Sequence, residues 1–481
     1  MIAATRTGFT PKASAGPTSP SGQDAVFVLN PQDAVVMQPG PFTVSDVSDG
    51  PHTEKVVVQG GLKPVSGQYV YPTTDPQYHG AVSFAACART VETFSKALGH
   101  PINWAFKSPQ LNVIPDDGEM LNAYYQRQNH SLHFFHATDT KTNQVVWSSD
   151  SGEVVSHETG HAILDGLRPA YLSSWSSDPP AFHESFGDVM AMMVTLQDDT
   201  VLQKLVDQTG GDLSKPNLVA NLGEQLGIAI NDNAGKNVTG GDWTRNAIND
   251  FTWIDPDTLS KSGDATHLGS EAHSFSRLWT GAIWDVMKGM TDGYLQQGQK
   301  PFDAIRQADN DMLNLYANLF KTAPQGNFTY RTMAKALVQA DKQYDNGKYA
   351  DLITKVFTAR QILQPGDTDH LSLPPQPIFK SQDDACRNVE VKLDGPQFGK
   401  FSGASVEEPV DADGSLSKDD DVKQQVQSNV ARLIADNRIK WTEPGQQLKQ
   451  ADYFDNKGRP YLGVVTWQDG KMAIQHTDIA D

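Results

Sequence analysis

The sequence predicts an α+β protein in which a β-rich part is followed by a helical part and then by a separate small domain. Up to about residue 150, short apolar runs are interrupted by Gly and Pro, which is typical of strands and turns. From residue 153 onward, apolar residues recur at the three- and four-residue spacing of helices. A cluster of prolines (Pro365, Pro374, Pro375 and Pro377) then precedes a second set of short apolar runs.

The individual elements follow from these patterns. Strands are expected at the apolar runs 25–30, 34–37, 55–59, 130–137 and 144–147. The first helix is expected at 83–98, because its apolar residues share one face and Gly99 follows as an end signal. Further helices are expected at 153–167, 182–196, 273–287, 302–321 and 328–363.

These elements divide the chain into four parts. Residues 1–24 are expected to be a disordered leader, because Ser, Pro, Gly and Thr dominate there. Residues 25–364 form the main domain, which is β-rich to about residue 152 and helical over 153–364. Residues 365–383 read as a Pro-rich linker, and 384–481 as a small α+β domain with one helix at about 420–436 and strands at 388–393, 461–467 and 471–476.

Charge and composition argue against two classes of protein, nucleic-acid-binding proteins and integral membrane proteins. The formal net charge of −19 argues against a nucleic-acid partner, and the acidic stretch 407–421 is expected to be a solvated loop. There is no apolar run of the roughly 18 residues that a membrane span requires. Without the apolar segment of a secretory signal, we expect either cytoplasmic residence or export by a non-classical route.

The strongest chemical signal is the sequence His-Glu-Thr-Gly-His from His157 to His161. Residues four apart lie on one face of a helix, so both imidazoles can reach one metal ion. Glu158 lies roughly 100° around the helix and is placed to act as a general base toward a water at the metal. The flanking residues are largely apolar, and burial of these polar groups is costly unless a metal satisfies them.

A third ligand is expected from the next helix. Glu184 and Asp188 are four residues apart and share a face of an otherwise apolar segment. We expect Glu184 to bind the metal and Asp188 to accept the ring N–H of a ligating histidine; the alternative is a pair of solvent-facing acids. Three protein ligands leave one zinc position open, which is typical of a catalytic site.

These residues resemble the thermolysin-like zinc metallopeptidases, gluzincins of the thermolysin and fungalysin type, over roughly residues 75–365. The resemblance implies a two-lobed peptidase fold, one zinc ion per chain and hydrolysis of peptide or protein substrates, most simply as an endopeptidase. It also assigns substrate-binding residues: Asn122 and Ala123 on an edge strand, and Arg245 as a ligand of a substrate carbonyl. Tyr171 and His273 would stabilise the oxyanion, with His267 as a competitor for the second role.

The sequence departs from the family pattern at several positions. His183 stands where the family carries an Asn that supports a zinc-binding histidine, and Leu268 stands where an Asp precedes the second catalytic histidine; Asp264 or Glu271 could substitute. Glu153 fits a calcium-ligand position of the family, but Thr195 falls where another calcium-binding acid is expected. A double calcium site is therefore not expected, whereas a single calcium ion remains open.

Two other functions stay open at this point. One is a gluzincin aminopeptidase, although residues 118–122 lack the acid that would recognise a free amine. The other is a catalytically silent binding protein on a peptidase scaffold. The small C-terminal domain could serve an unidentified partner of its own.

Overall fold

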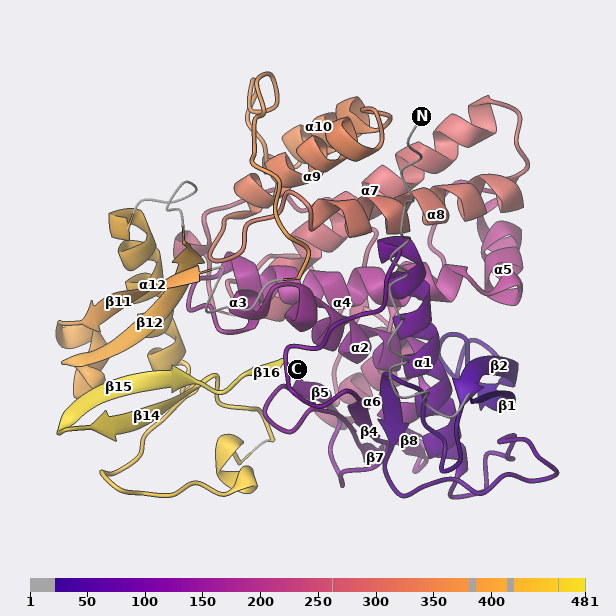
Figure 1. Cartoon of the computed structure of the whole chain (residues 1–481), viewed down its shortest axis with the longest axis horizontal. Helices are drawn as coiled ribbons and strands as arrows, with labels where there is room; N and C mark the ends of the chain where they lie inside the picture. The colour runs from indigo at the N-terminus through magenta and orange to yellow at the C-terminus, as the bar shows by residue number, and fades with distance from the viewer. Residues whose placement is uncertain (1–21, 262, 380–385, 413–418, 457, 481) are drawn as a thin grey trace, which may run out of the picture.

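The computed structural model of the chain describes residues 22–261, 263–379, 386–412, 419–456 and 458–480. The molecule is a mixed α+β protein, as predicted. Most of the predicted leader lies outside the described residues, but its last part does not, because strand β1 already begins at Gln23. Figure 1 shows one large body and, beside it, a smaller unit formed by the end of the chain.

A five-stranded mixed sheet lies on one side of the large body. Its order is β16 (Ile479–Ala480), β5 (Ala123–Gln126), β6 (Ser131–Phe134), β4 (Leu111–Ile114) and β3 (Val56–Val58). Strands β3, β4 and β6 are parallel, whereas β5 is antiparallel to both of its neighbours. Two smaller antiparallel pairs flank it: β1 (Gln23–Leu29) with β2 (Gly40–Val47), and β7 (His136–Thr138) with β8 (Val145–Trp147).

The expected strand at residues 34–37 is wrong, because this segment is a turn. The carboxylate of Asp33 accepts a hydrogen bond from the backbone N–H of Val35, which is the usual way in which Asp initiates a turn. The turn leaves Asp33 completely buried, a position that becomes relevant below.

Helices fill the rest of the body. The main ones are α1 (Tyr78–Leu98), α2 (Gly152–Leu167), α4 (Asp178–Leu196), α7 (Ala272–Gln296), α8 (Pro301–Leu319), α9 (Tyr330–Tyr344) and α10 (Ala350–Ala359). Shorter ones are α3 (Pro169–Leu172), α5 (Asp199–Thr209) and α6 (Glu224–Ala234), and β9 (Asn221–Leu222) pairs with β10 (Arg245–Asn246). Every predicted helix of the body is confirmed, although 328–363 is two helices rather than one.

Local chemistry explains where the central helices begin and end. The side chain of Ser151 caps α2 by accepting a hydrogen bond from the N–H of Val154. Helix α4 begins four residues earlier than predicted, with proline in its first turn, where a missing N–H costs nothing. Helix α1 ends as predicted at Gly99, whose φ of 77° suits glycine.

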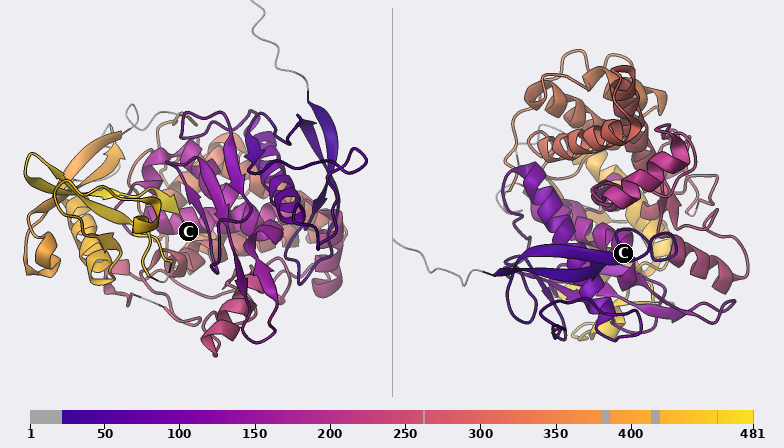
Figure 2. Two further views of the ribbon diagram at one scale, coloured as in Figure 1. Left: turned by 90° about the horizontal axis from the view of Figure 1, so that it is seen from below. Right: turned by 90° about the vertical axis from the view of Figure 1, so that its right-hand side faces the viewer.

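The end of the chain forms a second unit with its own core. Its sheet has the order β11 (Cys386–Leu393), β12 (Ala404–Asp411), β15 (Lys471–His476), β14 (Gly463–Gln468) and β13 (Ile439–Lys440). Helix α12 (Asp419–Ala435) covers this sheet with Val422, Val426 and Val430. Trp175 from the body packs into the same core, so the two units are joined by apolar contact. Figure 2 shows β16 leaving this unit to reach the body.

The prediction of a solvated acidic loop is wrong for residues 407–411, which belong to strand β12. Glu408 is completely buried against the body, where it accepts hydrogen bonds from the N–H of Trp175 at 2.6 Å and from Asn327 Nδ2 at 2.7 Å. Such donors compensate the cost of burying a carboxylate. Glu408 therefore links the two units.

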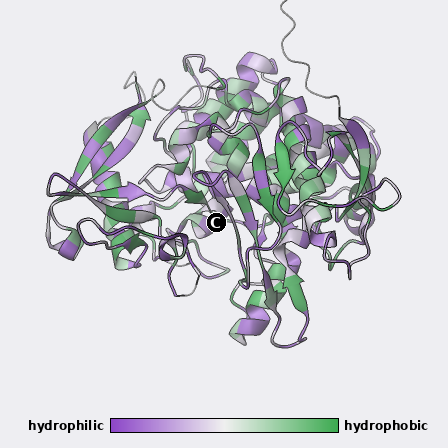
Figure 3. Cartoon of the chain, turned by 60° about the horizontal axis from the view of Figure 1, so that its bottom comes forward, coloured by the Kyte–Doolittle hydropathy of each residue, from purple (hydrophilic) through white to green (hydrophobic). Residues whose placement is uncertain are grey.

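The distribution of apolar residues matches this architecture. Figure 3 shows hydrophobic residues gathered on the packed helices and strands, whereas connecting loops are mostly hydrophilic. Within the described ranges, no helix combines the length and the apolarity that crossing a membrane requires.

Candidate metal centre

Helices α2 and α4 approach each other closely because glycine lies at their contact. A Cβ atom on Gly187 would stand 2.6 Å from Nδ1 of His157, and one on Gly160 would stand 3.0 Å from the Cα of Gly187. A side chain at position 187 would therefore displace the ring of His157, and one at position 160 would force the two helices slightly apart. The close contact allows residues on α2 and α4 to meet over one point.

Three predicted metal ligands meet there. Nε2 of His157 lies 3.5 Å from Oε2 of Glu184, and Nε2 of His161 lies 3.6 Å from Oε1 of the same carboxylate. Two ligands of a tetrahedral zinc ion, each about 2.0–2.1 Å from the metal, are about 3.3–3.4 Å apart. Glu158 is beside them, since ligand atoms of His157, Glu158 and His161 all lie within 4.8 Å of one another.

The burial of these groups also fits a metal. His157, His161 and Glu184 are at most 7% exposed. Within the described part of the chain, His161 Nε2 has no hydrogen-bond partner, although it is completely buried. Buried polar atoms without partners are costly, and a cation between them would remove that cost. Two imidazoles and one carboxylate are a donor set that catalytic zinc takes.

His157 is oriented by the buried carboxylate of Asp188. Its Nδ1 lies 3.1 Å from Oδ1 of Asp188, which leaves Nε2 facing Glu184. Arg245 and Thr280 also contact Asp188, at 2.8 and 3.0 Å. Burial raises the pKa of Asp188, but Arg245 and His157 more than offset this and hold it below its usual value. Asp188 is therefore an ionised acceptor for the ring N–H.

His161 is oriented by His183, a partner that the sequence left uncertain. The two Nδ1 atoms lie 2.8 Å apart. Burial lowers the pKa of both rings, that of His183 to about 3, so both are neutral. If Nε2 of His161 binds a metal, its proton must be on Nδ1, which then donates to Nδ1 of His183. His183 thus supplies the acceptor at the position where the resemblance led us to expect an Asn.

His273, at the start of α7, lies on the open side of the site and is 33% exposed. Its Nε2 is 3.3 Å from Oε2 of Glu184, and its Nδ1 is 2.7 Å from Oε1 of Glu271. Of the two substitutes considered for the missing aspartate, Glu271 therefore holds the ring. Asp264 instead pairs with His267, which is 77% exposed.

A cavity of about 350 Å³ opens beside the site and is bounded by the predicted substrate-binding residues. Asn122 and Ala123 line it together with His157, Glu158 and Arg245. Arg245, on β10, has Nη2 3.3 Å from His157 Nδ1 and Nη1 3.7 Å from Oε2 of Glu184. The rest of the lining is partly apolar, with Val154, Ala191, Leu222, Leu226 and Ile230.

Tyr171 is placed differently from the other predicted residues. It is completely buried, and its hydroxyl donates to the carbonyl of Pro324 at 2.5 Å. Burial raises its pKa far above the usual value. With its hydroxyl directed to Pro324, its role at an oxyanion stays a prediction.

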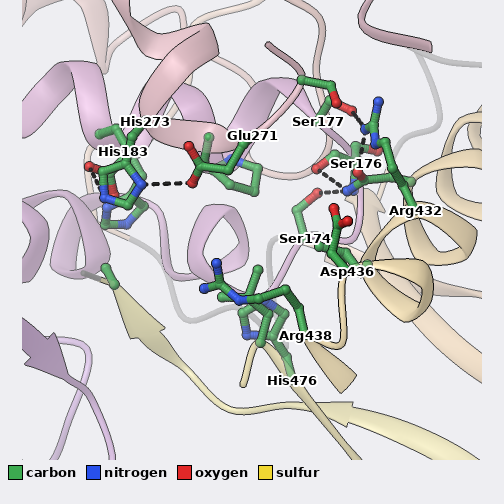
Figure 4. A pocket seen from close by; sticks show the side chains of 18 of the residues that line it. Ser174, Ser176, Ser177, His183, Glu271, His273, Arg432, Asp436, Arg438 and His476 are labelled. Carbon is green, nitrogen blue, oxygen red and sulfur yellow. Dashed lines mark hydrogen bonds and ion pairs between the residues drawn. The ribbon is translucent and has the colours of Figure 1, made fainter. Parts of the chain in front are cut away.

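A second cavity lies between the body and the appended unit. Figure 4 shows His183 and His273 on one side of it and Arg432, Asp436 and Arg438 on the other. Glu184 and the two residues of β16 also line it. The site is therefore flanked by two cavities, one bounded by the body and one closed by the end of the chain.

A separate acidic cluster joins Asp33, Glu153 and Glu224, with carboxylate oxygens within 4.8 Å of one another. All three are at most 5% exposed, and within the described ranges neither carboxylate oxygen of Glu224 has a hydrogen-bond partner. Burial raises the pKa of each, that of Glu224 to about 8. Asp33 and Glu224 were not identified from the sequence, because neither belongs to a local motif and the three acids are far apart in the chain.

No family model matches the chain, and no curated protein matches it. The function of the chain is therefore inferred from its residues and their geometry.

The contact between His161 and His183 yields a prediction. Replacing His183 by Ala removes the acceptor for His161 Nδ1, so zinc affinity is expected to fall by about 10–100-fold, as for other partners of ligating histidines. His183→Asn restores an acceptor and is expected to recover much of the affinity. Competition with a chelating dye measures both, with the exposed His267→Ala as control. Equal zinc affinity in His183→Ala and His267→Ala would contradict this role.

Proposed function

We propose that the chain is a zinc-dependent endopeptidase of the thermolysin-like type, with one zinc ion held by His157, His161 and Glu184. The observation that carries the proposal is the placement of two imidazole Nε2 atoms opposite the two oxygens of one buried carboxylate. The sheet-containing part and the helical part would then be the two lobes of such a peptidase, with the substrate between them.

When bound, zinc would supply a Lewis acid that polarises the scissile carbonyl and makes water a better nucleophile at neutral pH. Glu158, on α2 next to the first ligand, would accept the proton of the attacking water at its carboxylate and deliver it to the leaving nitrogen. Its near-complete burial, at 4% exposed, keeps bulk water away from this transfer.

His273 would donate from Nε2 to the negative charge that develops on the carbonyl oxygen. Glu271 suits this role, because it accepts from Nδ1 and so leaves Nε2 directed at the site. An interaction of this type contributes about 2–4 kcal/mol to the transition state. Arg245 and Asn122, which line the same cavity, would align the peptide backbone. The apolar lining near Val154 favours substrates with an apolar side chain in this cavity.

The proposal predicts that Glu158→Gln retains zinc and loses peptide hydrolysis by about 10²–10⁴-fold, the usual contribution of a general base. Zinc content and cleavage of casein and of an N-terminally acetylated peptide are measured in parallel. The exposed Glu119→Gln is the matched control and is expected to behave as wild type.

Cleavage of the acetylated peptide would distinguish an endopeptidase from an aminopeptidase. Zinc in every variant without any hydrolysis would favour the silent-scaffold alternative, and full activity in Glu158→Gln would refute the assignment of the base.

We also propose that Asp33, Glu153 and Glu224 bind one calcium ion. Three buried carboxylates are oxygen ligands of the kind that calcium takes. Gln32 lies beside the cluster, where its Nε2 donates to Oε1 of Glu153 at 3.1 Å. Because Glu153 is in the first turn of α2, this ion would join the start of the helix that carries both histidines to Asp33 and Glu224, and its binding would stabilise the folded chain.

Calcium is expected to raise the melting temperature of the zinc-loaded protein, by the equivalent of about 2.7 kcal/mol at 100 times its Kd. The effect is expected to be lost in Glu224→Gln and kept in Glu390→Gln, a control on an exposed side chain. Differential scanning fluorimetry in EGTA and in calcium measures it. A calcium shift of equal size in both variants would contradict the site.

A further inference from the structure

Strand β5, the predicted substrate-binding strand, is not an open edge. Strand β16 pairs with it in antiparallel orientation, with Ile479 opposite Gln126 and Ala480 opposite Tyr125. The N–H of Arg127 extends the ladder to the carbonyl of Asp478 at 3.2 Å. An exposed strand edge is where an extended peptide adds to a sheet. The chain's own residues 477–480 occupy that position, as Figures 1 and 2 show for β16.

Charge and apolar contacts hold the 477–480 segment in place. The carboxylate of Asp478 lies 3.2 Å from Nη1 of Arg127 and accepts a hydrogen bond from Ser173 Oγ at 3.1 Å. Arg127 also donates to Asp165, one turn beyond His161 on α2, at 2.9 Å. Ile479 is 2% exposed and packs with Tyr124. The segment is thus attached to the same helix that carries the two histidines.

The segment also reaches the candidate metal centre. Ile479 and Ala480 line the second cavity together with Glu184 and His273. In Figure 4 a pale yellow strand enters this cavity from the His476 side and points toward His183 and His273. The first cavity is lined by Ala123 and Glu158, and it shares Glu271 and His273 with the second.

The register gives the direction of a bound chain. From 479 to 480 the segment moves from Gln126 to Tyr125, toward Ala123. In the same register, the next two positions of a bound peptide would stand opposite Tyr124 and Ala123, beside Glu158. A substrate on this edge would therefore place its amino-terminal half where β16 lies and its carboxyl-terminal half in the cavity near Val154.

We propose that the 477–480 segment is an internal competitor that occupies the amino-terminal half of the peptide-binding edge, so that an extended peptide must displace it. The inference rests on the proposed function, because that function identifies the edge of β5 as the site for substrate. What it predicts is peptide binding, which can be measured without catalysis.

Two substitutions at Ala480 separate the pairing of β16 from the size of the side chain. Ala480→Pro removes the N–H that the ladder needs and so disfavours pairing, whereas Ala480→Ser keeps this N–H and nearly the size of alanine.

Binding is tested without catalysis, in the Glu158→Gln background. The probe is a fluorescein-labelled peptide Ile-Gln-His-Thr-Asp-Ile-Ala, the sequence of residues 474–480, and its affinity is measured by fluorescence anisotropy. Glu158→Gln/Ala480→Pro is expected to bind it about tenfold more tightly than Glu158→Gln, because the site is no longer filled from within. Glu158→Gln/Ala480→Ser is expected to match the parent. Ile479→Ser, which removes the apolar anchor, replaces Ala480→Pro if the proline variant does not fold.

Equal affinity in the parent, Ala480→Pro and Ile479→Ser proteins would overturn the inference. Casein hydrolysis by the single variant Ala480→Pro is expected to exceed that of wild type by a similar factor of about ten. If neither protein cleaves casein and the peptide still binds more tightly to the released variants, the proposed function fails and the inference about the segment stands.

Discussion

The contact of α2 with α4 is the constraint on which the site depends. Gly160 and Gly187 leave no room for side chains between the helices, so the ring of His157 lies against the backbone of α4. Residues one turn apart on α2 then face a carboxylate on α4, and all three groups are held by buried backbone rather than by loops. A site built on two packed helices is rigid, which suits precise ligand geometry.

Burial of so many polar groups requires partners, and these partners form a connected network. Asp188 serves His157, His183 serves His161, and Glu271 serves His273. Each partner fixes which ring nitrogen carries the proton and so which nitrogen faces the centre. The network accounts for the large number of titratable groups in an otherwise apolar core.

Features that depend on local spacing were predictable from the sequence. The placement of His157 and His161 on one helical face follows from their four-residue spacing, and the helices were located because their apolar periodicity is long. His183 and Glu271 could be identified in the sequence as residues near the predicted ligands. That His183 contacts His161 could not be predicted, because this contact depends on how the helices pack. Sequence patterns do not contain that information.

Long-range contacts account for the errors and omissions. Residues 407–411 were predicted to be a solvated loop because the stretch is rich in acidic residues. The carboxylate of Glu408 instead accepts hydrogen bonds from Trp175 and Asn327, which are more than 80 positions away in the chain. Asp33 reaches the acidic cluster through a turn that was predicted as a strand. The pairing of β16 with β5 joins the end of the sequence to its first third, and a two-residue strand has no sequence signal of its own.

The most direct test of the account is anomalous X-ray scattering at the zinc absorption edge from crystals grown with zinc. The account predicts one strong anomalous peak per chain, about 2.0–2.2 Å from Nε2 of His157, Nε2 of His161 and a carboxylate oxygen of Glu184. A peak elsewhere, or zinc-loaded crystals with no peak between these three residues, would contradict it.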